Sequence, residues 1–309
     1  MSEESLFFIF ILICIVSLRL YGHRKKVHHH YTRLCKPPEI EESDIVIIGK
    51  EMKLPSQEIH EILIKRFPYY CVLEPSLQKR FLSRLRNFMM NKIFIIKDEK
   101  GFKEMPVLVS ASAIQIGFGL QQYKLPFYKY IRIYPEEYFS EKEFFRVLAG
   151  NVQENIISIA WNHLLKDYKN ATDGVNTPLH EMSHALYIQK MVIDQHYARK
   201  FDVQYRQLLD TFRVAHQQEM QKQKDHYSEY AETDLQEFWA ESVELFFEKP
   251  DYLVEHYPDV FHAMTLLLNQ DPRNSNNPII NHNTDIKRRF DKLVQLVAKT
   301  SGAKKIINL

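Results

Sequence analysis

Two histidines stand four residues apart in this chain, in a stretch at residues 180–184 that reads HEMSH. On an α-helix, residues four apart lie on one face, so His180 and His184 can reach the same ion. Catalytic zinc is commonly held by three protein ligands, including histidines and a carboxylate, and keeps a fourth position open for water. Glu181 would then accept a proton from that water. The motif predicts a helix with part of a metal site; the alternative is an amphipathic helix with two surface histidines.

The residues before the motif favour a helix start. Gly174 and Pro178 bracket a turn, and Asn176 is of a type that caps helices. Apolar residues then follow at helical spacing. We therefore expect a helix of about fifteen residues that begins near Asn176.

The third ligand of such a site must come from elsewhere in the chain. One known arrangement places a glycine and a further histidine shortly after the second histidine. Here those positions hold Tyr187 and Lys190, so this arrangement is excluded. A carboxylate from a second helix remains.

Residues 233–247 are predicted to form that second helix, which ends before Pro250. Glu237, Glu241 and Glu244 fall on one face of it, where a bound cation would relieve their mutual repulsion. The alternative is a solvated acidic face whose first turn is capped from within the helix by Asp234 and Glu237.

Several short stretches together resemble the Mlc titration factor A family of zinc-dependent peptidases. The blocks that carry the resemblance are DGVN at 173–176, HEMSH at 180–184, YA at 230–231 and EFWA at 237–240. Weaker matches are IYP at 133–135, IAW at 159–161 and NQDP at 269–272. The resemblance covers about residues 56–275.

The resemblance implies an α+β, gluzincin-like zinc metallopeptidase domain that hydrolyses peptide or protein substrates. By position, His180, His184 and Glu237 would hold Zn²⁺ and Glu181 would be the general base. Tyr230, seven residues before Glu237, would stabilise the negative charge that develops on the substrate carbonyl oxygen.

The chain departs from the family at Tyr187, where members usually carry an aspartate. Such an aspartate would not bind the metal itself; it would hold one of the metal ligands in the right orientation by a hydrogen bond. We hypothesise that Glu241, at a position where the family tends to be apolar, replaces it by accepting a hydrogen bond from a ligand histidine.

Two other classes of function remain open at this point. The family is named for a protein that binds a transcriptional repressor, so the chain could be a regulator that sequesters a protein partner, with a structural or vestigial metal site. A weaker alternative is a membrane-tethered scaffold. The presence of Glu181, Tyr230 and Glu237 favours catalysis, because a protein that only binds a partner needs no general base.

The N-terminus predicts a membrane anchor. Residues 6–18 are free of charge, and basic residues follow them, which favours a single pass with the remainder in the cytoplasm. We expect an anchor at 1–21, a juxtamembrane linker at 22–55, the peptidase domain at 56–275, and a C-terminal loop and basic helix at 276–309.

Composition restricts the remaining possibilities. The formal net charge of +2 argues against a dedicated nucleic-acid binder, which would show a basic excess. The three cysteines are far apart and predict no disulfide framework.

Hydrophobic patterning predicts the elements around the site. Helices are expected near residues 56–66, 75–91 and 107–121, and strands near 45–48, 93–97, 128–134 and 155–160. The segment 154–161 is either an exposed edge strand that could bind an extended peptide or a core strand.

Overall fold

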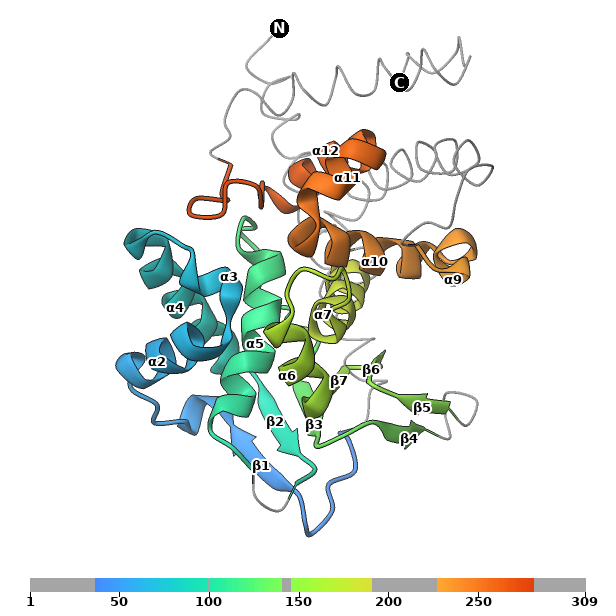
Figure 1. Cartoon of the computed structure of the whole chain (residues 1–309). Helices are drawn as coiled ribbons and strands as arrows, with labels where there is room; N and C mark the ends of the chain where they lie inside the picture. Colours follow the sequence, from blue (N-terminus) through green and yellow to red (C-terminus); the bar gives the residue numbers. More distant parts are fainter. Residues whose placement is uncertain (1–36, 99–100, 141–145, 191–226, 281–309) are drawn as a thin grey trace, which may run out of the picture.

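The structure, a computed structural model, describes residues 37–98, 101–140, 146–190 and 227–280. These residues form a mixed α+β fold in which helices pack against a five-stranded sheet (Figure 1). The predicted α+β class is therefore confirmed.

The sheet combines three parallel inner strands with two antiparallel outer ones. Its order is β1 (Ile45–Ile48), β2 (Ile93–Ile96), β3 (Tyr130–Tyr134), β7 (Ile156–Ala160) and β6 (Gly150–Gln153). The inner strands are rich in isoleucine and mostly buried, as expected of parallel strands covered by other elements. β1 and β6 form the edges of the sheet in the part of the chain described.

Of the two alternatives for residues 154–161, an edge strand or a core strand, the edge strand is wrong. β7 lies between β3 and β6, so the alternative, a core strand, is correct. Glu154 adopts a positive φ of 53° in a two-residue turn between Gln153 and Ile156, which are paired. That turn folds the preceding β6 against β7 and makes β6 the edge.

The first half of the fold surrounds one buried helix. α5 (Glu104–Gly117) is buried from Met105 to its end, in agreement with a sequence that is apolar or small on all sides. The amphipathic helices α2 (Ser56–Arg66) and α4 (Pro75–Met89) pack against it, and the short α3 (Pro68–Cys71) connects them.

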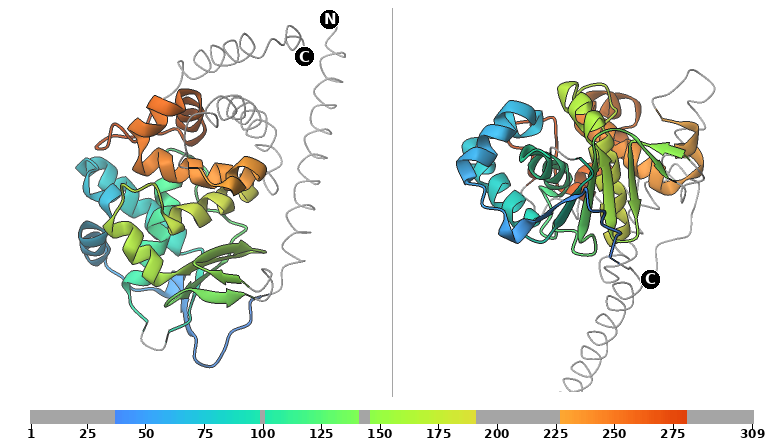
Figure 2. Two further views of the ribbon diagram at one scale, coloured as in Figure 1. Left: turned by 45° about the vertical axis from the view of Figure 1, so that its right-hand side comes forward. Right: turned by 90° about the horizontal axis from the view of Figure 1, so that it is seen from below.

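The second half carries the helices that the motifs predicted. α7 (Thr177–Ile188) packs on β6 and β7, and α10 (Leu235–Glu248) packs on α7. Figure 2 shows α10 crossing above α7 on the side away from the strands. The described residues of this half also form α6 (Trp161–Lys169), α9 (Glu229–Thr233), α11 (Pro250–His256) and α12 (Pro258–Leu268).

Most elements expected from patterning are present. The helices expected near 56–66 and 75–91 and the strands near 45–48 and 93–97 lie within two residues of α2, α4, β1 and β2. β1, although in the segment expected to be a linker, pairs with β2. The hairpin of β4 (Tyr138–Ser140) and β5 (Arg146–Leu148), the 3₁₀ turn Gly49–Glu51 and α6 were not anticipated.

Parts of the expected organisation fall outside the described residues. These are the anchor at 1–21, the linker up to residue 36, and residues 281–309 of the expected C-terminal loop and basic helix. Among the helices that the structure does describe, none has the length and apolar character needed to span a bilayer.

Candidate metal centre

The helix that bears both histidines starts where the sequence predicted. Asn176 is the N-cap of α7, and its Oδ1 accepts a hydrogen bond from the Leu179 amide at 3.0 Å. The Thr177 amide donates to Asp167 Oδ2 at 2.8 Å, and Pro178 has no amide hydrogen to satisfy. The amides of the first turn are thus either paired or absent, which stabilises the start of this helix.

The second helix is capped at its start and hydrogen-bonded to the first helix. Asp234 is the N-cap of α10 and accepts from the Gln236 amide at 2.6 Å, which fixes the turn that carries Glu237. Trp239 is fully buried and donates from Nε1 to the Ser183 carbonyl at 3.0 Å. This bond joins α10 directly to the HEMSH turn.

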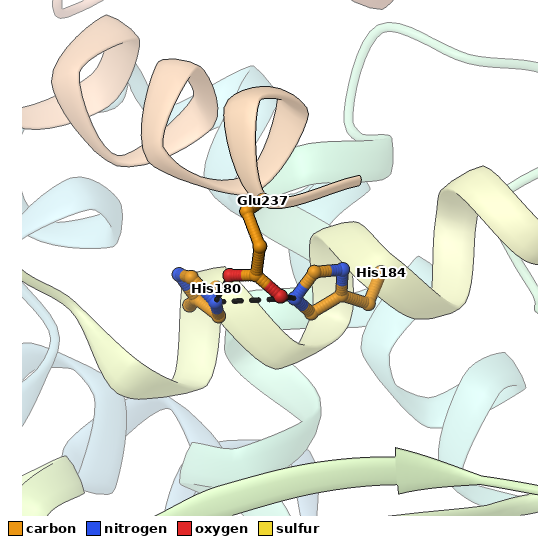
Figure 3. Close-up of side chains that lie close together, drawn as sticks. All are labelled: His180, His184 and Glu237. Atoms are coloured by element: carbon orange, nitrogen blue, oxygen red, sulfur yellow. Dashed lines mark hydrogen bonds and ion pairs between the residues drawn. The ribbon is translucent and has the colours of Figure 1, made fainter. Parts of the chain in front are cut away.

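The three predicted ligands converge, with their donor atoms all within 4.8 Å of one another. His180 Nε2 and His184 Nε2 are 3.1 Å apart. Glu237 reaches them with one oxygen each, at 3.2 Å from His180 and 3.4 Å from His184 (Figure 3). Two nitrogens and a carboxylate from two helices therefore face one point.

The electrostatics of the cluster match this arrangement. Hydrogen bonds from His180 and His184 hold the pKa of Glu237 well below its ordinary value. Burial lowers the pKa of His180, but the carboxylates of Glu237 and Glu244 outweigh it and hold that pKa well above the ordinary value. The carboxylates therefore favour positive charge at this point, which a bound metal cation can supply in place of a proton.

Glu181 lies beside the edge strand and is only 8% exposed. Burial raises the pKa of its carboxyl group, and the nearby histidines counteract this only in part. β6 passes so close that a Cβ at Gly150 would stand 2.5 Å from Glu181 Cγ. A glycine is required here for close approach, a role that no feature of the sequence indicated.

The hypothesis that Glu241 orients a ligand histidine is wrong. Both Glu241 oxygens accept from Ser228, one from its amide at 2.8 Å and the other from its hydroxyl. Glu244 makes the contact expected of Glu241, with Oε2 at 3.0 Å from His180 Nδ1. Counted from Glu237, position i+7 returns to within about 20° of the same direction on a helix, whereas i+4 is about 40° away.

Two further predicted positions have different surroundings. Tyr187, where the family usually has an aspartate, packs against the hydrophobic core. Tyr230 lies on α9 with a side chain that is 63% exposed. Its part in a reaction stays a prediction.

A cavity of about 430 Å³ opens beside the cluster. Its wall includes His180 and Glu181, and it therefore gives access to the proposed general base from the side of β6. The lining residues are Ala149, Gly150, Gly174, Val175, Thr177, His180, Glu181, Ser228, Glu241, Glu244 and Leu245.

Two histidines and a glutamate on paired helices beside a sheet edge are the features of a metallopeptidase. Comparison of the sequence with family models agrees: residues 47–268 match the glucose-regulated metallo-peptidase M90 family, and the chain belongs to it. This is the family of Mlc titration factor A, so the predicted membership is confirmed. The chain is also similar to the uncharacterized protein slr2042 of Synechocystis sp., with 23% identity over 222 residues, or 66% of this chain and 80% of that protein.

Proposed function

We propose that this protein is a zinc-dependent peptidase in which His180, His184 and Glu237 hold the metal. The observation that carries the proposal is the convergence of their three donor atoms within 4.8 Å. The donor set fits zinc, which accepts imidazole nitrogen and carboxylate oxygen and uses three protein ligands in catalytic sites. His180 fits in orientation too, because its Nδ1 faces Glu244 and its Nε2 faces the other donors.

When bound, zinc would lower the pKa of a water molecule and polarise the scissile carbonyl. Glu181 accepts the proton from that water and passes it to the leaving amine. Burial, which raises the pKa of Glu181, suits this double role because the carboxyl group must both take up and release a proton near neutral pH. Tyr230, by family position, would donate to the carbonyl oxygen as negative charge develops there.

The substrate would bind as an extended peptide along β6. An edge strand offers backbone hydrogen-bonding groups to an added strand, and β6 is an edge of the described sheet. Its first residue, Gly150, lies against Glu181, so a peptide aligned with β6 passes the general base. The proposed substrate site therefore runs along β6, one strand further out than β7.

The test measures zinc content and peptide hydrolysis on the full-length chain. We expect about one zinc per chain, loss of zinc in Glu237→Ala, and retention of zinc in Glu255→Ala, a matched change at an exposed glutamate of α11. A mixture of internally quenched fluorescent peptides serves as substrate. Glu181→Gln should keep its zinc and lose hydrolysis.

Two results would contradict the proposal, and they differ in meaning. A folded chain without zinc would exclude the metal site altogether. A zinc-loaded chain that hydrolyses no peptide, or one in which Glu181→Gln is as active as the wild type, would exclude the catalytic role and leave the partner-binding regulator as the explanation.

A further inference from the structure

Asn176 uses every hydrogen-bonding group that it has, and it is only 3% exposed. Its side-chain oxygen accepts from the Leu179 amide at 3.0 Å, and its backbone oxygen accepts from the His180 amide at 2.9 Å. Its backbone amide donates to Glu244 Oε1 at 2.6 Å, and its Nδ2 donates to Glu248 Oε1 at 2.7 Å. One residue therefore starts α7 and also binds two glutamates of α10.

Each of the two glutamates uses both of its carboxylate oxygens, one for each contact. Glu244 binds the Asn176 amide with one oxygen and faces His180 Nδ1 with the other, at 3.0 Å. Glu248 binds the Asn176 side chain with one oxygen and the Gly174 amide with the other, at 3.0 Å. Both glutamates are buried, with 6% and 7% exposure. A continuous chain of bonds thus runs from Glu248 through Asn176 and Glu244 to the ring of His180.

We propose that Asn176 and Glu244 are positioning residues for the metal centre, with Glu248 holding Asn176 in place. This inference rests on the proposed function, because it concerns how His180 is made ready for zinc. A carboxylate that accepts from Nδ1–H selects the tautomer whose Nε2 lone pair is free and holds the ring in one orientation. Asn176 fixes that carboxylate and also fixes the helix turn from which His180 projects.

Substitution of Glu244 by glutamine isolates the last bond of this chain. A glutamine has one acceptor oxygen, whereas Glu244 serves two donors, the Asn176 amide and His180 Nδ1. One of these bonds must be lost, so we expect zinc to bind about 10- to 100-fold more weakly. Glu241→Gln is the matched control on the same helix, because it removes the same charge but leaves the contact between Glu244 and His180 intact, so it should weaken zinc binding much less than Glu244→Gln.

A double substitution, Asn176→Asp with Glu248→Gln, exchanges the amide and the carboxyl group between these two positions and so tests the link through Asn176. Asn176→Asp keeps the helix cap but turns a carboxylate oxygen toward Glu248, so above about pH 8, where both carboxyl groups are ionised, we expect weaker zinc binding. Adding Glu248→Gln to it restores a donor between the two side chains, because the new amide donates to the introduced carboxylate and its oxygen accepts from Gly174. Zinc affinity of this double variant should return to within about threefold of the wild type.

Zinc dissociation constants of the full-length proteins are measured by competition with a chromophoric chelator, beside the melting temperatures of the metal-free forms. If the wild type and Glu244→Gln bind zinc equally tightly, this inference is wrong and the proposed function still stands. Failure of the exchange to restore affinity overturns the link through Asn176, whatever the melting temperatures. A wild type without zinc overturns the proposed function and the inference with it. Weakening by Glu244→Gln together with rescue by the exchange supports it.

Discussion

Replacement of Gly150 by alanine should slow peptide hydrolysis without loss of zinc. The added Cβ would stand 2.5 Å from Glu181 Cγ and 2.7 Å from Oε1, whereas ordinary contacts begin at 3.4 Å. The Glu181 side chain must therefore move by about 0.9 Å, the difference between 3.4 and 2.5 Å. A misplacement of about 1 Å can cost on the order of 100-fold in rate, equivalent to about 2.7 kcal/mol of activation free energy.

The assay is kcat of the zinc-loaded, full-length Gly150→Ala variant on the quenched peptides, with zinc content and melting temperature measured in parallel. Glu181→Ala supplies the control for the melting temperature, because it removes the Cγ and carboxyl atoms that the added methyl group would meet. Adding Gly150→Ala to Glu181→Ala should therefore lower the melting temperature much less than adding it to the wild type. A variant that keeps kcat within about threefold of the wild type, or an equal fall of the melting temperature in both backgrounds, would refute the reasoning.

Two further predictions concern stability. Burial raises the pKa of Glu248 to about 8, so the unfolded chain releases this proton at lower pH than the folded one, and stability falls as pH rises from about 4.5 toward 8. Chemical unfolding across this range should show that the free energy of unfolding falls more steeply for the wild type than for Glu248→Gln. The total difference should be less than about 5 kcal/mol, and parallel curves would contradict the prediction. Lys92, 1% exposed, donates from Nζ to the carbonyls of Lys124, Leu125 and Tyr128. Lys92→Met leaves three carbonyl acceptors, two of them in buried hydrogen bonds, without this donor and should lower the free energy of unfolding by about 3 kcal/mol. A methionine variant as stable as the wild type would mean that burial of the ammonium group costs as much as its three bonds contribute.

The parts of the site that depend on neighbours in sequence could be predicted. The spacing of His180 and His184, the cap at Asn176 and the start of the second helix near Asp234 are local features, and the structure has all of them. Local patterning also located most strands, because runs of isoleucine identify buried strands without reference to their partners.

The parts that depend on tertiary pairing could not be predicted in this way. Periodicity puts Glu237, Glu241 and Glu244 on one face, but the side chain that meets His180 depends on how α10 is placed on α7. For the same kind of reason the sequence could not decide whether residues 154–161 form an edge strand or a core strand, since a strand becomes an edge by the pairing of its neighbours. No sequence pattern identified Gly150, because its role is defined by its contact with Glu181, a residue far along the chain.

The two helices of the metal centre are far apart in the order of synthesis. A ribosome that has just completed α7 has released both histidines, but Glu237 and the orienting Glu244 are added later with α10. A growing chain therefore has an incomplete donor set until most of the described fold has been made. Under the proposed function, capture of the metal by all three donors is therefore a late event of biogenesis, which follows the synthesis of α10.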